Sequence, residues 1–360
     1  MLTPSDYMDR ALFLAARGRG RTTPNPMVGA VVVAPDGVVV GWGYHAKAGE
    51  AHAEVKALRM AGERARGATL YCTLEPCSHW GRTPPCAPLV ADSGIRHLVA
   101  AMQDPNPRVS GQGFALLRER GVTVDTGLQG AAAESLNRGY ITRTRHQRPF
   151  VILKAAIGLD GAIAEAPGRR TALTSHQANR HAHQVRAEVD AIGVGSQTIL
   201  VDDPLLTARG PYRPRPLLRV IFDRTLRMAP GARVLSTLPA GPVIIVTGDE
   251  HAGTEHARRL TDLGARIEYV EAPTVAAALA RLATIGVGSL LLEGGARLQG
   301  AAWDEQLVDA VQLYVAPRVF GPGAVRFLEG RPFRTGDLVE RRTLALGPDV
   351  LIEGYVHRTH

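Results

Sequence analysis

The hydrophobic pattern up to residue 127 alternates between helix-like and strand-like segments. Apolar residues recur at helical spacing over residues 5–17, which predicts an amphipathic helix. Further helices are predicted over residues 53–66, 84–93 and 113–121. Short apolar runs predict strands over residues 27–34, 38–45, 68–74, 97–101 and 122–127, with a turn at Pro35-Asp36-Gly37 between the first two. This order predicts one layered α/β domain.

The same alternation restarts after a polar, arginine-rich segment at residues 138–149. We place a domain boundary near residue 146, which gives domains over residues 1–146 and 147–360; the polar segment also fits an exposed last helix of the first domain. Strands are then predicted over residues 150–157, 191–195, 217–223, 243–247, 289–294 and 310–317, with a strand pair over 343–357. Helices are predicted over residues 175–189, 254–263, 274–285 and 296–303. Strand–helix–strand units of this length favour a largely parallel sheet covered on both faces.

Composition narrows the class of protein. A chain of 360 residues with 45% hydrophobic positions is long enough for two soluble domains, and no apolar run approaches the roughly 20 residues of a membrane span. The N-terminus does not look like a signal peptide, so we expect a cytoplasmic protein. Three cysteines argue against a disulfide framework. The net charge of +8 suggests nucleic acid, a phosphorylated small substrate, or only an arginine-rich surface; the arginines are scattered, so no nucleic-acid tail is indicated.

Two of the cysteines lie in the stretch Leu74–Cys86, "LEPCSHWGRTPPC", and each directly follows a proline. Upstream, His52 and Glu54 stand two positions apart at the start of a predicted helix. Zinc prefers tetrahedral N and S ligands, and a catalytic site keeps one position open for water. His52, Cys77 and Cys86 would supply three ligands. Glu54 would be a carboxylate outside the ligand set that takes up and delivers protons.

This set follows the signature of zinc deaminases, H-x-E followed by P-C-x-x-C, with one departure. His52-Ala53-Glu54 and Pro76-Cys77 match, but the second cysteine follows after nine positions rather than three. Taken singly, each element is ordinary, because H-x-E is common and a buried cysteine is usually a small apolar residue, as we expect for Cys72. The combination in this order predicts a zinc site.

Longer motifs surround these residues. The first domain contains "TPNPMVGAVVV", "GYHAKAGEAHAEVKAL", "TLEPCSHWGRTPPC" and "DPNPRVSGQG". The second contains, in order, "LKAAIGLDGAIA", "GSQTILVDDPLLTAR" and "LLEGGARLQGA". Together these motifs resemble the bifunctional riboflavin-biosynthesis deaminase/reductase, and the resemblance covers essentially the whole chain.

The resemblance implies an α/β chain in which a cytidine-deaminase-like three-layer domain is followed by a dihydrofolate-reductase-like domain. It also implies two reactions. The first is zinc-dependent hydrolysis of the 2-amino group of 2,5-diamino-6-(5-phosphoribosylamino)pyrimidin-4-one, with release of ammonia. The second is NADPH-dependent reduction of the ribosyl group to a ribityl chain. The partners would then be one zinc ion, NADPH, a phosphorylated pyrimidine and further copies of the chain, with neither nucleic acid nor membrane.

Carried over to the first domain, the resemblance makes His52, Cys77 and Cys86 the zinc ligands and Glu54 the proton shuttle. Asn25, in the motif "PNP", would hydrogen-bond the pyrimidine. The insert between the cysteines would line the substrate pocket through His79 and Arg82. Arg82 would meet the substrate phosphate or, alternatively, would be a solvated loop charge.

In the second domain, no G-x-G-x-x-G follows a strand and opens a helix, so the doubly wound dinucleotide fingerprint is absent. The glycine pair Gly294-Gly295 fits a backbone that approaches cofactor phosphates, or a simple strand-to-helix turn. The resemblance places ten residues near NADPH: Ala156, Thr198, Asp202, Gly295, Ala296, Arg297, Leu298, Gln299, Gly300 and Ala301.

The resemblance also places Arg186, Leu206, Arg209 and Glu293 near the reductase substrate. Arg186 and Arg209 would be bidentate partners for its phosphate. Lys154 and Asp202 would assist hydride transfer by orienting or protonating the opened sugar. Many relatives have serine where this chain has Gly158, and serine and tryptophan where it has Arg170 and Ala172. Arg170 would add a phosphate contact or only face solvent.

Two other classes of protein fit part of the pattern. A nucleic-acid deaminase, such as a tRNA adenosine deaminase, shares the H-x-E and Pro-Cys elements and suits the positive charge. It predicts the short C-x-x-C spacing and no reductase half. A non-catalytic zinc-binding protein needs neither Glu54 nor the glycine-rich second domain.

Overall fold

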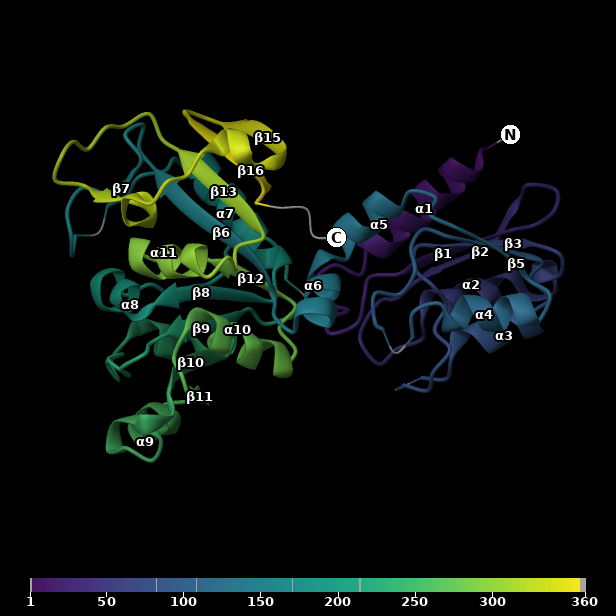
Figure 1. Ribbon diagram of the computed structural model, residues 1–360, viewed down its shortest axis with the longest axis horizontal. Coiled ribbons are helices and arrows are strands. Elements are labelled where there is room, and N and C mark those ends of the chain that lie inside the picture. Colours follow the sequence, from purple (N-terminus) through teal and green to yellow (C-terminus); the bar gives the residue numbers. More distant parts are fainter. Residues whose placement is uncertain (1, 82, 108, 170, 214, 357–360) are drawn as a thin grey trace. The chain divides into compact units, whose positions relative to one another are not determined.

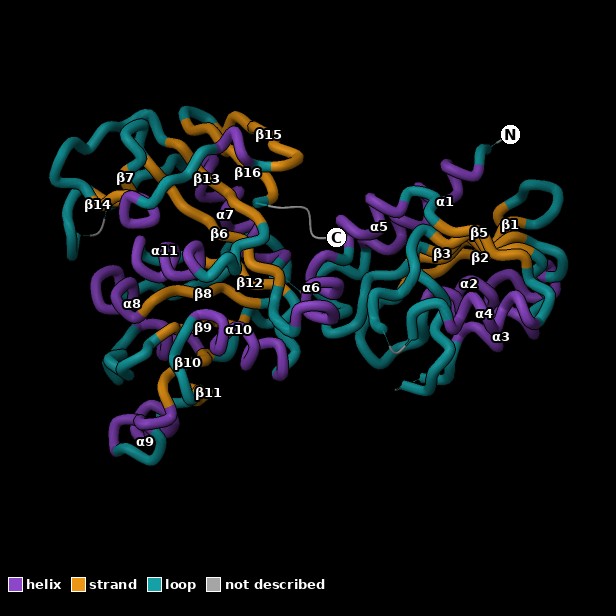
Figure 2. Tube along the Cα trace, viewed as in Figure 1, coloured by secondary structure: helices purple, strands orange, loops and turns teal. Residues whose placement is uncertain are grey.

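The computed structural model describes residues 2–81, 83–107, 109–169, 171–213 and 215–356. The contacts divide the chain into two compact units, Met1–His146 and Gln147–His360. Each unit is built around its own principal sheet (Figures 1 and 2). None of the helices in the described ranges combines the length and apolar character that crossing a membrane needs.

The first unit has a five-stranded sheet in the order β2-β1-β3-β4-β5. β1 pairs antiparallel with both β2 and β3, whereas β3, β4 and β5 are parallel to one another. The strands are β1 (Gly29–Val33), β2 (Val39–Tyr44), β3 (Thr69–Cys72), β4 (His97–Ala100) and β5 (Thr123–Thr126). The helices are α1 (Pro4–Ala16), α2 (Ala53–Ala61), η1 (Gly62–Ala65), α3 (Cys86–Asp92), α4 (Gln112–Glu119), α5 (Gly130–Leu136) and α6 (Arg138–His146).

Glycines let helices approach both faces of this sheet. A Cβ on Gly41 of β2 would lie 2.1 Å from the carbonyl oxygen of Ala57 in α2, and a Cβ on Gly29 of β1 would lie 2.0 Å from that of Ala11 in α1. Any side chain at either position would therefore push the helix away. Figure 1 shows α1 and α5 on one side of the sheet and α2, α3 and α4 on the other. The close contact of α2 brings its N-terminus, with His52 and Glu54, down onto the sheet.

The second unit has a nine-stranded sheet in the order β11-β10-β9-β8-β12-β6-β13-β16-β15. The seven strands from β11 to β13 in this order are parallel, and β16 and β15 complete the sheet in antiparallel pairing. Its strands are β6 (Phe150–Ile157), β8 (Ala191–Gly195), β9 (Leu218–Phe222), β10 (Val243–Gly248), β11 (Ala265–Val270), β12 (Ser289–Leu292), β13 (Ala310–Val315), β15 (Val339–Leu346) and β16 (Asp349–Tyr355). A separate two-stranded sheet pairs β7 (Ala162–Ala164) with β14 (Val325–Arg326).

Helices cover both faces of the nine-stranded sheet. Leu290 and Leu292 of β12 belong to the core cluster that includes Leu279 of α10, whereas Leu291 belongs to the cluster that includes Ile199 of α8. Successive residues of a strand point to opposite faces, so the two clusters lie on opposite sides. The helices are α7 (His176–Glu188), α8 (Ser196–Asp202), η2 (Arg233–Ala240), η3 (Asp249–His251), α9 (Glu255–Asp262), α10 (Val275–Thr284), α11 (Ala296–Asp304), η4 (Phe327–Gly330) and η5 (Thr335–Asp337).

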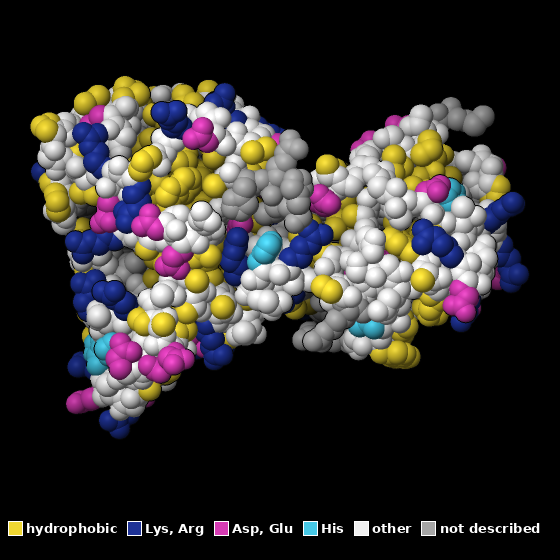
Figure 3. Space-filling model, in the orientation of Figure 1, with side chains coloured by type: hydrophobic (Ala, Val, Ile, Leu, Met, Phe, Trp, Pro, Cys, Tyr) yellow, Lys and Arg dark blue, Asp and Glu magenta, His cyan; other side chains and the backbone are white. Residues whose placement is uncertain are grey.

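The elements predicted from the hydrophobic pattern are present, and the sheet of the second unit is largely parallel and covered on both faces, as expected. The elements outside the predictions are α5, β7, α8, β11, β14 and the short helices η2, η3, η4 and η5. All three cysteines are free, and Cys72 is fully buried in the core of the first unit, as predicted. On the face drawn in Figure 3, Lys and Arg side chains are scattered among acidic and neutral ones.

Candidate active sites

Three segments bring a histidine and two cysteines together in the first unit. His52 caps the N-terminus of α2, Cys77 lies in the loop after β3, and Cys86 is the first residue of α3. Nδ1 of His52 lies 3.5 Å from Sγ of Cys77 and 3.3 Å from Sγ of Cys86. All three ligand atoms lie within 4.8 Å of one another. The structure thus unites the three residues that the sequence predicted as zinc ligands.

The donor set fits a zinc ion. With Zn–S bonds of about 2.3 Å and a Zn–N bond of about 2.0 Å, tetrahedral angles put N and S ligand atoms about 3.5 Å apart. The thiolate is the form of cysteine that binds metal. A hydrogen bond from the Cys86 side chain is the main reason that the pKa of Cys77 falls to about 4, and His52 adds to the effect. The backbone N–H of Cys86 also donates to Sγ of Cys77, at 3.3 Å.

Thr83 holds the remaining nitrogen of His52, a contact that the sequence analysis did not predict. Its Oγ1 lies 3.2 Å from Nε2 of His52. With Nδ1 bound to a metal, the ring hydrogen would lie on Nε2, which would then donate to Thr83. Such an outer hydrogen bond fixes the tautomer and ring orientation of a metal-binding histidine. The available signal was the position of Thr83 inside the insert between the cysteines.

Glu54 is the buried carboxylate of this site. It lies in the first turn of α2 and is only 3% exposed. Burial raises its pKa to about 7. Its Oε2 atom is buried and has no hydrogen-bond partner among the described residues. A buried polar atom without a partner is costly and marks a position where a ligand or water is expected.

Asn25 reaches this region through a second histidine. Its Nδ2 lies 3.2 Å from Nε2 of His45, and the His45 ring meets the His52 ring edge-on at 5.3 Å between centroids. His45 is buried, and the sequence analysis missed it although it lies in the motif "GYH". His79 is exposed in the insert. Arg82 lies outside the described residues.

Glu75 anchors the loop that follows β4 to the segment carrying Cys77. Both carboxylate oxygens of Glu75 accept backbone N–H groups, from Asp104 at 3.1 Å, Gly111 at 2.9 Å, Gly113 at 2.8 Å and Phe114 at 3.3 Å. The residue is almost fully buried. A carboxylate can accept all four hydrogen bonds, whereas an amide cannot. The carboxylate at position 75 therefore fixes the backbone at Asp104 and at residues 111–114 relative to the segment that carries Cys77.

We expect the substitution Glu75→Gln to loosen residues 104–114. The amide NH2 would face backbone N–H donors, and each buried donor left without an acceptor costs about 1–3 kcal/mol. Hydrogen exchange of the backbone amides should show a large loss of protection in this segment. Glu63→Gln is the matched control, because the Glu63 side chain is 87% exposed and pairs with Arg66 at the surface. Equal protection in the Glu75 variant and the wild type would contradict the anchoring role.

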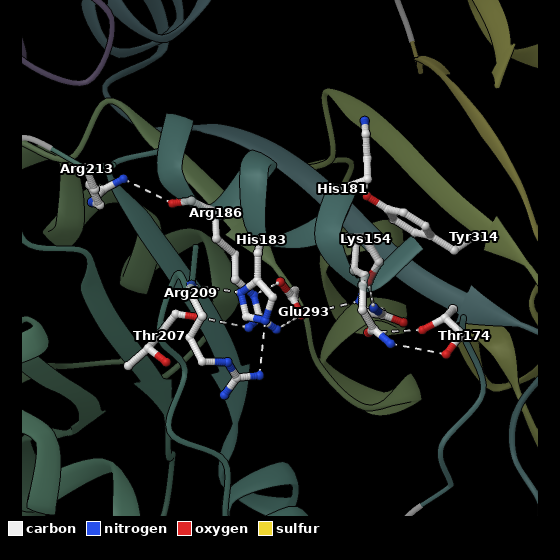
Figure 4. Close-up of polar contacts among 12 residues, drawn as sticks. Lys154, Thr174, His181, His183, Arg186, Thr207, Arg209, Arg213, Glu293 and Tyr314 are labelled. Atoms are coloured by element: carbon white, nitrogen blue, oxygen red, sulfur yellow. Dashed lines mark hydrogen bonds and ion pairs between the residues drawn. The ribbon is translucent and has the colours of Figure 1, made fainter. Parts of the chain in front are cut away.

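In the second unit, a buried cluster forms around Glu293, where β12 ends next to β6 (Figure 4). Nε and Nη2 of Arg186 each donate to one carboxylate oxygen of Glu293 at 2.7 Å. Nζ of Lys154 lies 3.5 Å from Oε2 of the same residue. Burial alone would raise the pKa of Glu293, but the charges of Lys154 and Arg186 outweigh it and lower this pKa to about 2. The sequence named all three residues but not their pairing.

Lys154 also contacts Tyr314 of β13. Its Nζ lies over the Tyr314 ring, 5.3 Å from the centroid. The hydroxyl of Tyr314 lies 2.8 Å from Nδ1 of His181 on α7. Tyr314 was not among the predicted site residues. Together with Glu293, it holds the Lys154 ammonium group at a defined place beside β6.

Most of the predicted cofactor residues lie in or next to two helices, α8 and α11, which follow two neighbouring strands of the sheet. β8 and β12 are parallel neighbours; α8 begins directly after β8, and α11 begins after the segment Glu293-Gly294-Gly295 that follows β12. Oγ1 of Thr198 lies 3.8 Å from the position that a Cβ on Gly295 would take. Asp202, the last residue of α8, is one helical turn beyond Thr198 and on the same face. The structure therefore brings Thr198 and Gly295 together at this edge of the sheet.

Within α11, the side chains take different roles. Ala296 is buried, Arg297 is exposed and pairs with Glu329, and Leu298 packs against Gly294. Nε2 of Gln299 donates to the carbonyl oxygen of Lys154 at 2.9 Å and so ties α11 to β6. Gly300 faces Arg331, whose Nη1 would lie 2.4 Å from a Cβ at this position, and Ala301 packs against the core. The side chains of Leu298, Gln299 and Ala301 are thus engaged in packing or hydrogen bonding within the unit.

The other predicted residues lie around this edge of the sheet. Ala156 is on β6, next to Tyr314 of β13 in the register of the two strands. Leu206 is buried in a left-handed backbone conformation, with φ of 53°. The carbonyl oxygen of Ala172 accepts a hydrogen bond from Arg318 at 2.8 Å. Arg170 lies outside the described residues.

Known protein families match both units. Residues 1–102 match the family model described as the cytidine and deoxycytidylate deaminase zinc-binding region, and residues 149–352 match the RibD C-terminal domain. Riboflavin biosynthesis protein RibD of Aquifex aeolicus is 41% identical over 318 residues, covering 88% of each chain. That of Escherichia coli is 38% identical over 367 residues, covering 96% of this chain and 97% of the relative.

Solved structures give the same result. Acinetobacter baumannii RibD superposes with a TM-score of 0.84 at 33% identity, covering 98% of both chains. A diaminohydroxyphosphoribosylaminopyrimidine deaminase/5-amino-6-(5-phosphoribosylamino)uracil reductase of Thermotoga maritima superposes with a TM-score of 0.82, also at 33% identity and 98% coverage of both chains.

Fold and site together define a zinc-binding deaminase of the cytidine deaminase class joined to a reductase. The chain belongs to the RibD family of riboflavin biosynthesis proteins. It is a bifunctional deaminase and reductase of riboflavin biosynthesis. The family match confirms the predicted function and disfavours the alternative of a nucleic-acid deaminase.

Proposed function

We propose that the first unit hydrolyses the 2-amino group of 2,5-diamino-6-(5-phosphoribosylamino)pyrimidin-4-one and that the second unit reduces the ribosyl group of the product with NADPH. One observation carries this proposal: the ligand atoms of His52, Cys77 and Cys86 lie within 4.8 Å of one another beside the buried Glu54, on a chain whose other unit is a RibD C-terminal domain. The substrate is that of the bifunctional family to which the chain belongs.

In the deaminase unit, His52, Cys77 and Cys86 hold one zinc ion. Zinc, when bound, supplies a water whose pKa is lowered to about 7. Oε2 of Glu54, which lacks a protein partner among the described residues, would take up a proton and deliver it to the leaving amine, which would depart as ammonia. Asn25, held by His45, and the insert residues His79 and Arg82 bind the pyrimidine and its phosphate.

In the reductase unit, the backbone at Gly295 and the side chains of Thr198 and Asp202 would hold NADPH, which would supply the hydride. Arg209, Leu206 and the Arg186–Glu293 pair bind the substrate. The Lys154 ammonium group, held by Glu293 at 3.5 Å, would orient the opened sugar or donate a proton to its nitrogen during the reduction. Asp202 shares this task.

Two assays on one protein sample test the proposal. Zinc-loaded protein given the diaminopyrimidinone should release ammonia, and the deaminated product should then be reduced with oxidation of NADPH. If neither reaction occurs, the proposal fails. Ammonia release without NADPH oxidation would retain the deaminase and discard the reductase.

We expect Cys86→Ala to abolish zinc retention and deamination while reduction of the already deaminated substrate continues. Removing one of three protein ligands opens the site to water and removes one thiolate. Zinc per chain should be measured by elemental analysis, together with both activities. Cys72→Ala is the matched control, since Cys72 is buried in the core and is not a ligand. Loss of both activities in Cys86→Ala would contradict two independently folded sites.

We expect Asp202→Asn to slow reduction far more than it weakens NADPH binding. The amide keeps the size and hydrogen-bonding reach of the side chain but loses the charge that orients or protonates the sugar. Single-turnover rates and the Kd for NADPH should be measured side by side. An unchanged reduction rate would remove Asp202 from the catalytic group.

A homo-oligomeric state, a cytoplasmic location and the absence of a nucleic-acid partner stay predictions from the sequence. Size-exclusion chromatography with light scattering tests the first. The amino-acid sequence does not by itself distinguish NADPH from NADH, and the Kd values of the two cofactors decide this point.

A further inference from the structure

His183 on α7 meets Arg209, in the loop between α8 and β9, through two contacts (Figure 4). The backbone N–H of Arg209 donates to Nδ1 of His183 at 3.2 Å. The guanidinium Nη2 of Arg209 lies 3.1 Å from Nε2 of the same ring. One histidine thus contacts both the backbone and the side chain of an arginine that the sequence analysis assigned to the substrate.

The positions of the protons make these contacts informative. A neutral imidazole has one nitrogen that donates and one that accepts, and guanidinium nitrogens only donate. Because Nδ1 accepts from the backbone, the ring hydrogen is on Nε2. The Nε2–H group of His183 and the Nη2–H group of Arg209 are therefore two donors that face each other at 3.1 Å. In the opposite tautomer, the hydrogen on Nδ1 would face the backbone N–H of Arg209, so two donors would again face each other. Within the pair, neither group offers the other an acceptor, and an anionic oxygen that both donors reach from one side would supply it.

Protonation of the ring does not relieve this shortage. Burial and the charges of Arg186 and Arg209 lower the pKa of His183 to about 4, against smaller opposing effects of Glu293 and the Thr207 backbone. At neutral pH the ring is therefore uncharged and presents a single donor. None of the described ion pairs includes Arg209, and its side chain is exposed. Its positive charge is available to a ligand.

Arg186, the other arginine assigned to the phosphate, is committed elsewhere. Its Nε and Nη2 atoms bind both carboxylate oxygens of Glu293 at 2.7 Å, and Nη1 donates to the carbonyl oxygen of Thr207 at 3.2 Å. The two donors that a planar guanidinium uses for bidentate recognition thus already bind a carboxylate. A second hydrogen-bond donor beside Arg209 has to come from a residue other than Arg186. His183 contacts Arg209 and can supply this donor.

We propose that His183 and Arg209 together bind the phosphate group of the reductase substrate, with Nε2–H of His183 as the neutral second donor. The backbone contact at Nδ1 fixes the ring so that this donor points to the same place as the arginine. The inference rests on the proposed reductase function, and it adds a substrate-binding residue that the sequence did not name.

The test compares phosphorylated and dephosphorylated forms of the reductase substrate. For His183→Leu we expect KM for the phosphorylated substrate to rise about 10- to 100-fold, the range of one hydrogen bond to a charged group. KM for the dephosphorylated substrate and the Kd for NADPH should not change, and kcat should stay within about twofold. His183→Gln should recover most of the affinity, because an amide both accepts and donates. His176→Leu, at an exposed position of the same helix, is the control.

A direct binding measurement accompanies the kinetics. Ribose 5-phosphate should bind the wild-type reductase unit in the full chain and bind His183→Leu at least about tenfold more weakly by calorimetry. ¹⁵N spectra of the wild-type imidazoles, with His183 assigned by its absence in His183→Gln, should show the proton on Nε2 at neutral pH. The ¹⁵N measurement does not use the leucine variant, so it tests the position of the proton even if that variant folds poorly.

Several results would overturn the inference. A loss of affinity that is equal for the phosphorylated and dephosphorylated substrates would give His183 a merely structural role. A weaker Kd for NADPH with unchanged substrate KM would assign the donor pair to a cofactor phosphate. If the proton is on Nδ1, Nε2 of His183 carries no hydrogen and cannot be the second donor to the phosphate. If wild-type protein oxidises no NADPH with either substrate, the proposed function fails, and that result is distinct from a failure of this inference alone.

Discussion

Glu54→Gln should abolish ammonia release while zinc content and NADPH-dependent reduction stay at wild-type levels. Glutamine fills the same buried space in the first turn of α2 but cannot carry a proton between water and amine. General acid–base groups contribute about 10²- to 10⁴-fold, and here one carboxylate serves both half-steps, so we expect a loss of at least about 10³-fold. Zinc should be retained, because Glu54 is not one of the three ligand residues that lie within 4.8 Å.

The matched control for this variant is Glu50→Gln. The Glu50 side chain is 51% exposed and pairs with Lys56 at 3.7 Å, so its loss should leave both activities unchanged. Ammonia release, zinc per chain and NADPH oxidation should be measured on each protein. Wild-type ammonia release by Glu54→Gln would discard the proton shuttle, and loss of zinc would give Glu54 a structural role at the metal.

Glu293→Gln should remove the reductase activity and destabilise the second unit. The carboxylate lies between Lys154 at 3.5 Å and Arg186 at 2.7 Å, and its side chain is only 10% exposed. Removing one member of a buried ion-pair group leaves uncompensated charge and costs about 3–5 kcal/mol. Denaturant unfolding followed at Trp303, whose sequence position puts it in the second unit, should show the loss.

Glu329→Gln serves as the control for Glu293→Gln. Glu329 is 40% exposed and pairs with Arg331 at 3.1 Å, so its loss should have a small effect on the free energy of unfolding. Unchanged unfolding of Glu293→Gln would mean that Lys154 and Arg186 find other partners. Full reductase activity in this variant would remove Glu293 from the substrate site.

The same carboxylate makes the stability of the second unit depend on pH. The pKa of Glu293 is about 2 in the folded protein against an ordinary value of 4.5, because the charges of Lys154 and Arg186 outweigh the effect of burial. A depressed pKa means that the stabilisation is fully present above pH 4.5 and is lost as pH falls toward 2. The difference corresponds to about 3 kcal/mol. Unfolding measured across this window should lose that contribution in the wild type and not in Glu293→Gln.

Much of the fold could be predicted because buried strands are continuous apolar runs bounded by turns. The strand over residues 191–195 was predicted with the bounds that β8 has. β11 was missed because Arg266 and Glu268 interrupt it; they pair with each other at this edge strand, and Glu268 also binds Arg281 of α10. α8 was missed because it follows β8 directly and has no side-chain cap at its start.

The two sites differ in how far the sequence could predict them. The candidate zinc ligands and Glu54 follow from a local signature, and the structure brings all four together. In the reductase unit, the sequence predicted Arg186 and Glu293 as two separate substrate residues. They form one bidentate ion pair, although they are 107 positions apart in the chain. No local pattern indicates such a partner, because the parallel order β8-β12-β6 decides which side chains meet.

By itself, the sequence determined two α/β domains, the three residues that fit zinc and the carboxylate beside them, since these depend on periodicity and short spacings. Only the tertiary structure decided which partner each polar group takes. Glu75 meets four backbone N–H groups, Arg186 binds Glu293, and His183 faces Arg209. These pairings join segments that are distant along the chain. They also set the charge, tautomer and free donors of each group, and those properties determine what ligand the site can bind.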